Sequence, residues 1–260
     1  MIGLFVWFYY FKRFLSRKKL LKAAFPGSYI EILKNNMKIY NILPDELKKD
    51  LHSKINVFLS EKSFEGCGGL ELNDEIRLTI AGSACILLLN RKTSFFSRLE
   101  SILVYPSSYL VNTKKNIGGQ FVDDIEHLTG ESWSYGTVVL AWDHVKRGVY
   151  DIKDGQNVVM HEFAHQLDQE DGQADGAPIL EKRSAYKLWA QVLGSSYHKF
   201  INKINSGNDD VIDDYGATDP AEFFSVVTET FFEKPKQLKN KYPELYEEFK
   251  KYYKLDPVSW

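Results

Sequence analysis

Apolar residues recur at intervals of three and four along most of this 260-residue chain, the spacing that places them on one face of an α-helix. Five segments with this pattern predict helices, at residues 45–62, 74–89, 180–205, 220–232 and 235–253. Short runs rich in β-branched and aromatic residues predict strands at 99–105, 109–111 and 137–142. The pattern therefore predicts a mostly helical α+β fold with a small β-sheet.

No long linker rich in Pro, Gly or Ser, no low-complexity stretch and no internal repeat divides the chain. With 44% hydrophobic residues it can bury a full core. We therefore expect a single domain over residues 20–260, acting as a monomer.

Residues 1–19 form a distinct N-terminal segment, because the first eleven are almost wholly apolar and a basic cluster follows them. Eleven residues are too few to span a bilayer as a helix, and the charge follows the apolar stretch, which is the wrong order for a secretory signal. Two interpretations stay open: a weak contact with a membrane surface, and a first helix packed on the domain.

Charge and cysteine usage narrow the function classes. The chain has 33 Lys and Arg against 35 Asp and Glu, so nothing indicates direct nucleic-acid binding. Cys67 and Cys85 lack a spacing typical of metal or redox sites, which favours free thiols and a cytoplasmic location.

The pentapeptide His161-Glu162-Phe163-Ala164-His165 is the strongest chemical signal. Apolar residues around it predict a helix that ends near Gly172, where glycine suits a left-handed C-terminal residue. On a helix, His161 and His165 lie one turn apart on one face and can bind one zinc ion. Glu162, beside that face, can then accept a proton from a zinc-bound water.

A catalytic zinc site needs a third protein ligand, and the sequence leaves the choice open. Glu222 is one candidate, but Asp219 and Pro220 predict a helix start, so Glu222 could instead close a capping box. Glu229, two turns further along, is a second candidate. The acidic residues Asp168, Asp171 and Asp175 are neighbours that could also orient the histidines, or form a solvated loop.

Residues 158–178 read Val-Val-Met-His-Glu-Phe-Ala-His-Gln-Leu-Asp-Gln-Glu-Asp-Gly-Gln-Ala-Asp-Gly-Ala-Pro, and residues 215–224 read Tyr-Gly-Ala-Thr-Asp-Pro-Ala-Glu-Phe-Phe. With residues 69–77 and 134–142, these blocks resemble the Mlc titration factor A family of zinc metallopeptidases. That family is similar in its catalytic core to the protease domain of anthrax lethal factor, which implies a zincin-like metallopeptidase domain.

The resemblance implies specific roles at matching positions. It implies one Zn²⁺ per chain with His161, His165 and Glu222 as ligands, Glu162 as general base, and Tyr215 as a hydroxyl donor to the oxyanion. A loop aromatic packed on the fold is the alternative for Tyr215, since the chain has fifteen tyrosines.

The site residues and the family resemblance lead to two candidate functions. The first is a zinc-dependent metallopeptidase, either an aminopeptidase or an endopeptidase, acting on peptides or proteins. The second, implied by the family name, is a regulatory protein that sequesters a transcriptional repressor, with zinc structural or conditional. The residues favour the peptidase, because structural zinc usually has four protein ligands rich in Cys. Residues 136–142 could pair with an extended substrate if their strand lies at a sheet edge, or form a core strand.

Overall fold

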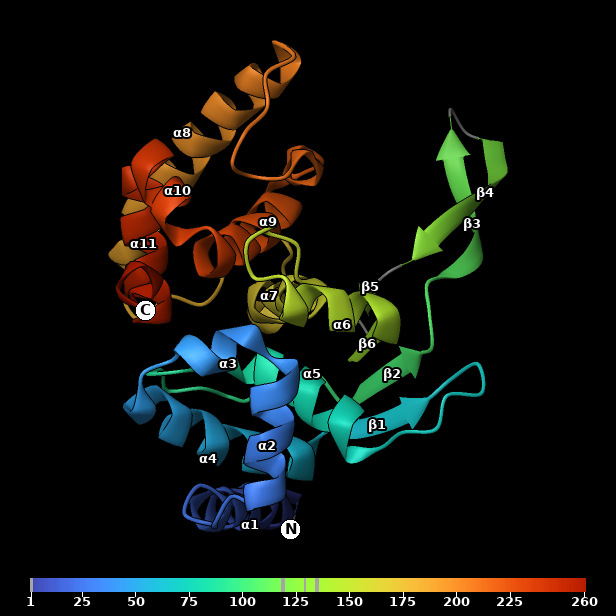
Figure 1. The fold of residues 1–260 in the computed structure, drawn as a ribbon, viewed down its shortest axis with the longest axis vertical. Helices are drawn as coiled ribbons and strands as arrows, with labels where there is room; N and C mark the ends of the chain where they lie inside the picture. The colour runs from blue at the N-terminus through green and yellow to red at the C-terminus, as the bar shows by residue number, and fades with distance from the viewer. Residues whose placement is uncertain (1, 118–119, 129, 134–135) are drawn as a thin grey trace.

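The computed structural model describes residues 2–117, 120–128, 130–133 and 136–260, with side chains described at 11–108 and 136–260. The N-terminal half contains helices α1 to α5 and the first five strands: α1 (Ile2–Leu20), α2 (Gly27–Asn36), α3 (Lys38–Ile42), α4 (Asp45–Glu61), β1 (Ser63–Gly66), α5 (Asp74–Ile86), β2 (Ser101–Tyr105), β3 (Tyr109–Ile117), β4 (Gln120–Leu128) and β5 (Gly130–Trp133). The remainder contains β6 (Thr137–Ala141), α6 (Trp142–Tyr150), α7 (Val158–Asp168), η1 (Gln169–Asp171), α8 (Ala185–Asn205), η2 (Asp214–Ala217), α9 (Pro220–Glu233), α10 (Pro235–Lys241), α11 (Pro243–Tyr253) and η3 (Pro257–Ser259). The fold is mostly helical α+β, as predicted (Figure 1).

The main sheet has the strand order β1-β2-β6-β5, and β3 and β4 form a separate antiparallel pair. Strands β1, β2 and β6 run parallel, whereas β5 runs antiparallel to β6. Because β6 pairs on both sides, the suggestion that this strand offers an edge to a substrate is wrong. Strand β5 lies at that edge of the sheet.

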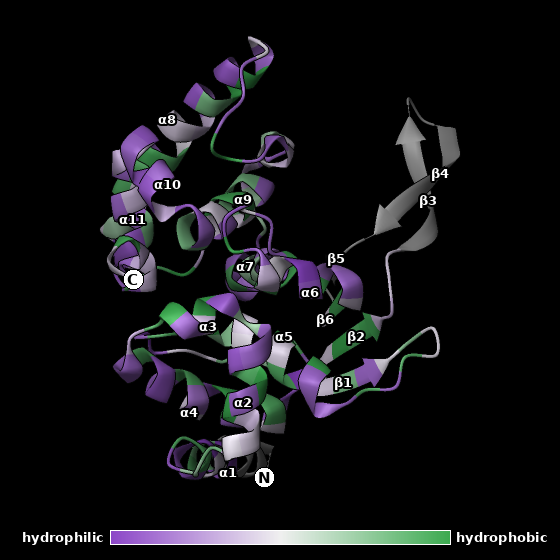
Figure 2. Cartoon of the chain, in the orientation of Figure 1, coloured by the Kyte–Doolittle hydropathy of each residue, from purple (hydrophilic) through white to green (hydrophobic). Residues whose placement is uncertain are grey.

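Helix α5 runs through the centre of the core. Every residue from Leu78 to Ile86 is buried, and the burial continues into Leu87–Leu89, which the sequence predicted as helix but which form turns. In Figure 2 strand β2 is mostly hydrophobic while α6 is mostly hydrophilic. The apolar surface is therefore concentrated between the sheet and the helices that cover it.

Two other predicted helices differ from the observed ones. The helix expected over 235–253 is divided into α10 and α11, because Pro243 has no N–H and Tyr242 before it leaves the helical conformation, with φ −133° and ψ 65°. The helix expected from residue 180 begins at Ala185. The helices at 45–61 and 220–233 and the strands at 101–105 and 137–141 match their predictions closely.

Helix α1 packs against α4 through its charged residues. Arg13 Nη2 and Arg17 Nη2 each donate to Glu61 Oε2 at 2.7 Å. Within the part of the chain that the structure describes, no helix combines the length and apolarity needed to cross a membrane.

Candidate metal centre

Helix α7 carries the pentapeptide, and local capping fixes where it begins. The Oδ1 atom of Asn157 accepts the N–H of Met160 at 3.1 Å, which satisfies a backbone donor at the helix N-terminus. Phe163 and Ala164 are completely buried. Gly172, with φ +102°, ends the helical segment in the left-handed conformation that the sequence predicted. Burial of the apolar face leaves His161 and His165 together on the other face.

Helix α9 brings the third candidate ligand. Asp219 Oδ1 accepts the N–H of Ala221 at 2.8 Å and that of Glu222 at 2.9 Å, and Pro220 occupies the first turn. The Glu222 side chain points away from this cap, with Oε2 at 3.0 Å from His161 Nε2. The geometry therefore favours the ligand interpretation of Glu222 over a capping box.

Three donor atoms converge where α7 meets α9. His161 Nε2 and His165 Nε2 lie 3.2 Å apart, and Glu222 Oε2 lies 3.0 and 3.3 Å from them. Bonds of about 2.05 Å in a tetrahedral zinc site require ligand atoms about 3.3 Å apart. The two imidazoles and one carboxylate thus fit a single metal ion of the kind that accepts nitrogen and oxygen ligands.

Glu229 holds His161 from the side opposite Glu222. Its Oε1 atom lies 2.8 Å from His161 Nδ1, and its Oε2 atom accepts the backbone N–H of Asn157. A histidine that donates Nδ1–H to a carboxylate presents the Nε2 lone pair to a metal. The structure therefore places Glu229 on the Nδ1 side of His161, behind a candidate ligand, whereas the sequence offered Glu229 as an alternative ligand.

The protonation states of His161 and Glu222 depend on the groups that they contact. Burial alone would lower the pKa of His161, but the charge of Glu229 and the hydrogen bond to Glu222 raise it well above its ordinary value. Burial would raise the pKa of Glu222, but hydrogen bonds from His161 and His165 lower it to about 2. Glu222 is therefore a carboxylate, and a metal ion bound at His161 Nε2 would displace a proton from that nitrogen.

Glu162 lies beside the cluster and is 5% exposed. Burial raises its pKa to about 7, against the lowering effect of the charges on His161 and His165. A carboxylate with this pKa can both accept and return a proton near neutral pH.

Tyr215 lies in η2, immediately before α9, and is 56% exposed. Its ring centroid is 5.9 Å from that of His161. Asp213 Oδ1 accepts the Tyr215 N–H at 3.0 Å, and the buried Gly216 packs against Val226 of α9. The structure thus brings Tyr215 to the rim of the site that holds the two histidines and Glu222.

The acidic residues after the pentapeptide accept backbone N–H groups of the loop that follows α7. This role differs from the orientation of the histidines that the sequence suggested for them. Asp168 is completely buried, and its Oδ2 accepts the N–H of Gly176 at 2.9 Å. Asp171 and Asp175 accept backbone N–H groups within their own loop. The backbone of Gly176 lies close to Pro220, so this loop supports the start of α9.

Asn157 and Glu233 are site residues that the sequence reasoning missed. Asn157 Nδ2 donates to Glu233 Oε1 at 3.1 Å, and burial raises the pKa of Glu233 to about 9. The signal for Asn157 was available, since Asn directly before an apolar helical run is typical of an N-cap. Glu233 had no comparable signal.

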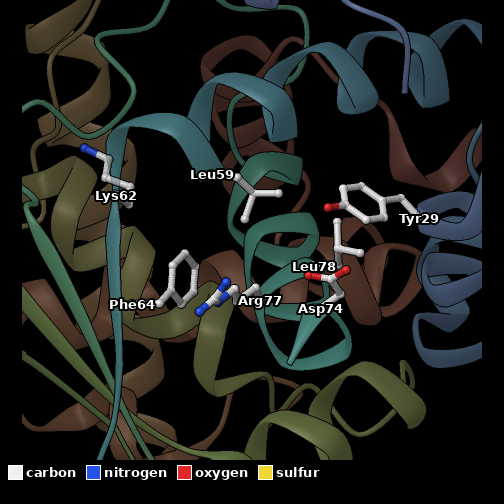
Figure 3. Close-up of a pocket in the computed structure, with 7 residues that line it drawn as sticks. All are labelled: Tyr29, Leu59, Lys62, Phe64, Asp74, Arg77 and Leu78. Atoms are coloured by element: carbon white, nitrogen blue, oxygen red, sulfur yellow. The ribbon is translucent and has the colours of Figure 1, made fainter. Parts of the chain in front are cut away.

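A pocket of ≈ 300 Å³ lies elsewhere, among α2, α4, α5 and β1 (Figure 3). Its lining residues are Tyr29, Leu59, Lys62, Phe64, Asp74, Arg77 and Leu78. The Lys62 amine points away from Leu59 and Tyr29 and donates to the carbonyls of Phe96 and Leu99, both at 2.7 Å. It therefore stabilises the chain around residues 96–99 and offers no charge to a ligand.

Comparisons with known proteins agree with this geometry. A family model described as glucose-regulated metallo-peptidase M90 matches residues 11–254. The chain is 39% identical to an uncharacterized protein from Synechocystis sp. over 93% of this chain and 88% of that protein. It is 31% identical to Mlc titration factor A from Pectobacterium atrosepticum, over 84% of this chain and 82% of the relative. The same protein from Klebsiella pneumoniae is also 31% identical, over 78% and 77%.

A metallopeptidase family implies a bound metal ion, and the only group of side chains that could hold one among the described residues lies within the matched region. Since the match spans nearly all of the sequence, the chain belongs to the glucose-regulated metallo-peptidase M90 family.

Proposed function

We propose that this protein is a zinc-dependent peptidase whose single metal ion is held by His161, His165 and Glu222 and whose general base is Glu162. The convergence of two Nε2 atoms and one carboxylate oxygen within 3.3 Å of one another supports this proposal most strongly. Three protein ligands are typical of catalytic zinc, because the fourth position stays open for water or substrate.

When bound, zinc would polarise a peptide carbonyl and acidify water. The remaining chemistry belongs to the side chains. Glu162 takes a proton from the attacking water and passes it to the leaving amine, which its pKa of about 7 allows. Glu229 keeps the His161 ring oriented with Nε2 toward the metal position.

Tyr215 is proposed to donate its hydroxyl proton in a hydrogen bond to the oxyanion that forms when water attacks the carbonyl. Its location at the rim of the site, close to the His161 ring, supports this role. An extended peptide could reach the site along β5, which lies at an edge of the sheet and contacts α7.

A second candidate function comes from the relatives. Mlc titration factor A proteins are 29–31% identical to this chain, and their name refers to titration of Mlc. We propose that this chain can likewise bind a transcriptional repressor, with or without peptidase activity.

Hydrolysis of a peptide library by the zinc-loaded protein and by Glu162→Gln tests the peptidase, with metal content measured in both. The expected result is cleavage by the wild type and a loss of at least about a hundredfold in the variant at unchanged zinc content. An equally active Glu162→Gln protein would contradict the assignment of the base. Absence of cleavage by either protein would favour the repressor-binding function.

A further inference from the structure

One face of α1 is fixed against the domain. Arg17 Nε and Nη2 donate to the Glu61 carboxylate at 2.6 and 2.7 Å, and Arg17 Nη2 also donates to the Ser94 carbonyl at 2.8 Å. The Arg17 guanidinium lies 4.8 Å from the centroid of the Phe95 ring. Arg13 binds the same Glu61 carboxylate one turn earlier. These contacts determine which side of the helix faces inward.

The opposite side presents apolar side chains to solvent. At 100° per residue around the helix axis, Phe11 and Leu15 lie roughly opposite the arginines. Phe14 lies between Phe11 and the arginines. Phe11 is 44% exposed, Phe14 61% and Leu15 49%. Three large apolar side chains within five residues are unusual for a surface that faces only water.

Lysines surround these apolar residues. Four of them, all exposed, lie on or just after the helix: Lys12, Lys18, Lys19 and Lys22. The first thirty residues contain six basic and no acidic side chains, although the whole chain has 33 basic against 35 acidic. Glu61 offsets one of the two arginine charges, so the lysines add to a positive surface around an apolar centre. We call Phe11, Phe14, Leu15 and the four lysines the α1 face.

We propose that the α1 face binds the surface of a bilayer that contains anionic phospholipid, with the helix lying in the interface. Aromatic and aliphatic side chains enter the boundary between headgroups and acyl chains, while lysine amines contact the phosphates. A symmetric pairing of two copies through this face would bring the lysines of one copy close to those of the other, which disfavours self-association. Exposed Phe and Leu side chains equally disfavour a nucleic acid as the partner.

This surface would hold the enzyme in one orientation on the membrane. Figure 1 shows α1 at one end of the longest axis of the molecule and α8 reaching toward the other, with α7 between them. The metal centre, where α7 meets α9, lies away from α1. Binding at the α1 face therefore leaves the metal centre accessible, and the inference does not depend on the peptidase activity.

Co-sedimentation of the full chain with phosphatidylcholine vesicles, with and without phosphatidylserine, tests the proposal. The wild type should bind the anionic vesicles, and binding should weaken as salt is added. The double variant Phe14→Ser/Leu15→Ser should lose binding. Lys18→Glu/Lys22→Glu should reduce it by at least about tenfold, since each lysine near an anionic surface contributes separately.

Leu188→Ser is the matched control, because Leu188 is 45% exposed and belongs to α8, a helix that lies away from α1 in Figure 1. It should bind like the wild type. All variants keep the bonds to Glu61, so equal thermal unfolding temperatures will show that the fold is intact. The proposal is overturned if the wild type ignores anionic vesicles, or if Phe14→Ser/Leu15→Ser binds them undiminished. It is also overturned if the substitutions abolish only self-association or binding to nucleic acid.

Discussion

Glu229 offers the sharpest test of how the fold prepares the metal site. Its two oxygens accept from two different donors, His161 Nδ1 at 2.8 Å and the backbone N–H of Asn157. Glutamine has one carbonyl oxygen and one amide NH2 in their place. Whichever way the amide of Glu229→Gln is turned, its NH2 group faces another donor. The substitution therefore leaves one buried donor without an acceptor.

The free-energy cost of the unpaired donor depends on how deeply Glu229 is buried. Glu229 is 6% exposed, so little water can reach the site to accept a hydrogen bond from the unpaired donor. A buried donor without a partner costs about 1–3 kcal/mol. If the cost falls on the orientation of His161, zinc affinity should fall by about 10- to 100-fold, as for other groups behind metal ligands.

A competition titration of zinc against a chromophoric chelator measures this change. Glu233→Gln is the matched control, because Glu233 lies one turn further along α9 and also binds Asn157. Burial raises the pKa of Glu233 to about 9, so it is already a neutral acid at neutral pH, and an amide resembles it. We expect little change in zinc affinity for the control. Unchanged zinc affinity in Glu229→Gln, or equal losses in both variants, would contradict the role of Glu229 in orienting His161.

Two further predictions concern stability, both measured by urea unfolding. Gly176→Ala should cost about 2–3 kcal/mol, because φ is +77° and a Cβ would lie 2.5 Å from the Pro220 carbonyl oxygen. Gly207→Ala, with φ +70° and open space, should cost only about 1 kcal/mol, so equal costs would contradict the role of the Gly176 contact. Burial would raise the pKa of Glu61, but hydrogen bonds from the arginines of α1 lower it from 4.5 to about 2. This stabilisation is complete above pH 4.5 and is lost as the pH falls toward 2. Glu61→Gln should lose about 1 kcal/mol at neutral pH and show a flatter decline in acid, whereas an unchanged acid profile would contradict the assignment.

Local signals predicted the two helices of the metal centre. The apolar run from Val158 marks α7, the glycine at 172 ends η1, which continues it, and Asp219 with Pro220 starts α9. Each signal acts within one turn of helix, so the sequence carries it directly. The continuous helix expected over 235–253 was wrong for a local reason as well, since Pro243 interrupts the hydrogen bonding.

The contacts between segments that lie far apart in the chain could not be predicted from the sequence. Glu222 and Glu229 both lie on α9, two turns apart, and spacing alone could not distinguish a ligand from the partner of a ligand. The crossing of α7 and α9 favours Glu222 as the proposed ligand, since it brings Glu222 to the Nε2 side of His161 and Glu229 to the Nδ1 side. The late start of α8 has a nearby partner instead, since the Leu180 N–H donates to the hydroxyl of Tyr186 in the first turn of the helix.

One metal ion is proposed to bind where His161, His165 and Glu222 meet. Anomalous diffraction at the zinc edge from crystals of the zinc-loaded protein tests this most directly. We expect one peak per chain, about 2.0–2.2 Å from both Nε2 atoms and a Glu222 oxygen. A peak coordinated by Glu229 in place of Glu222, or no peak between the two histidines, would contradict the proposal.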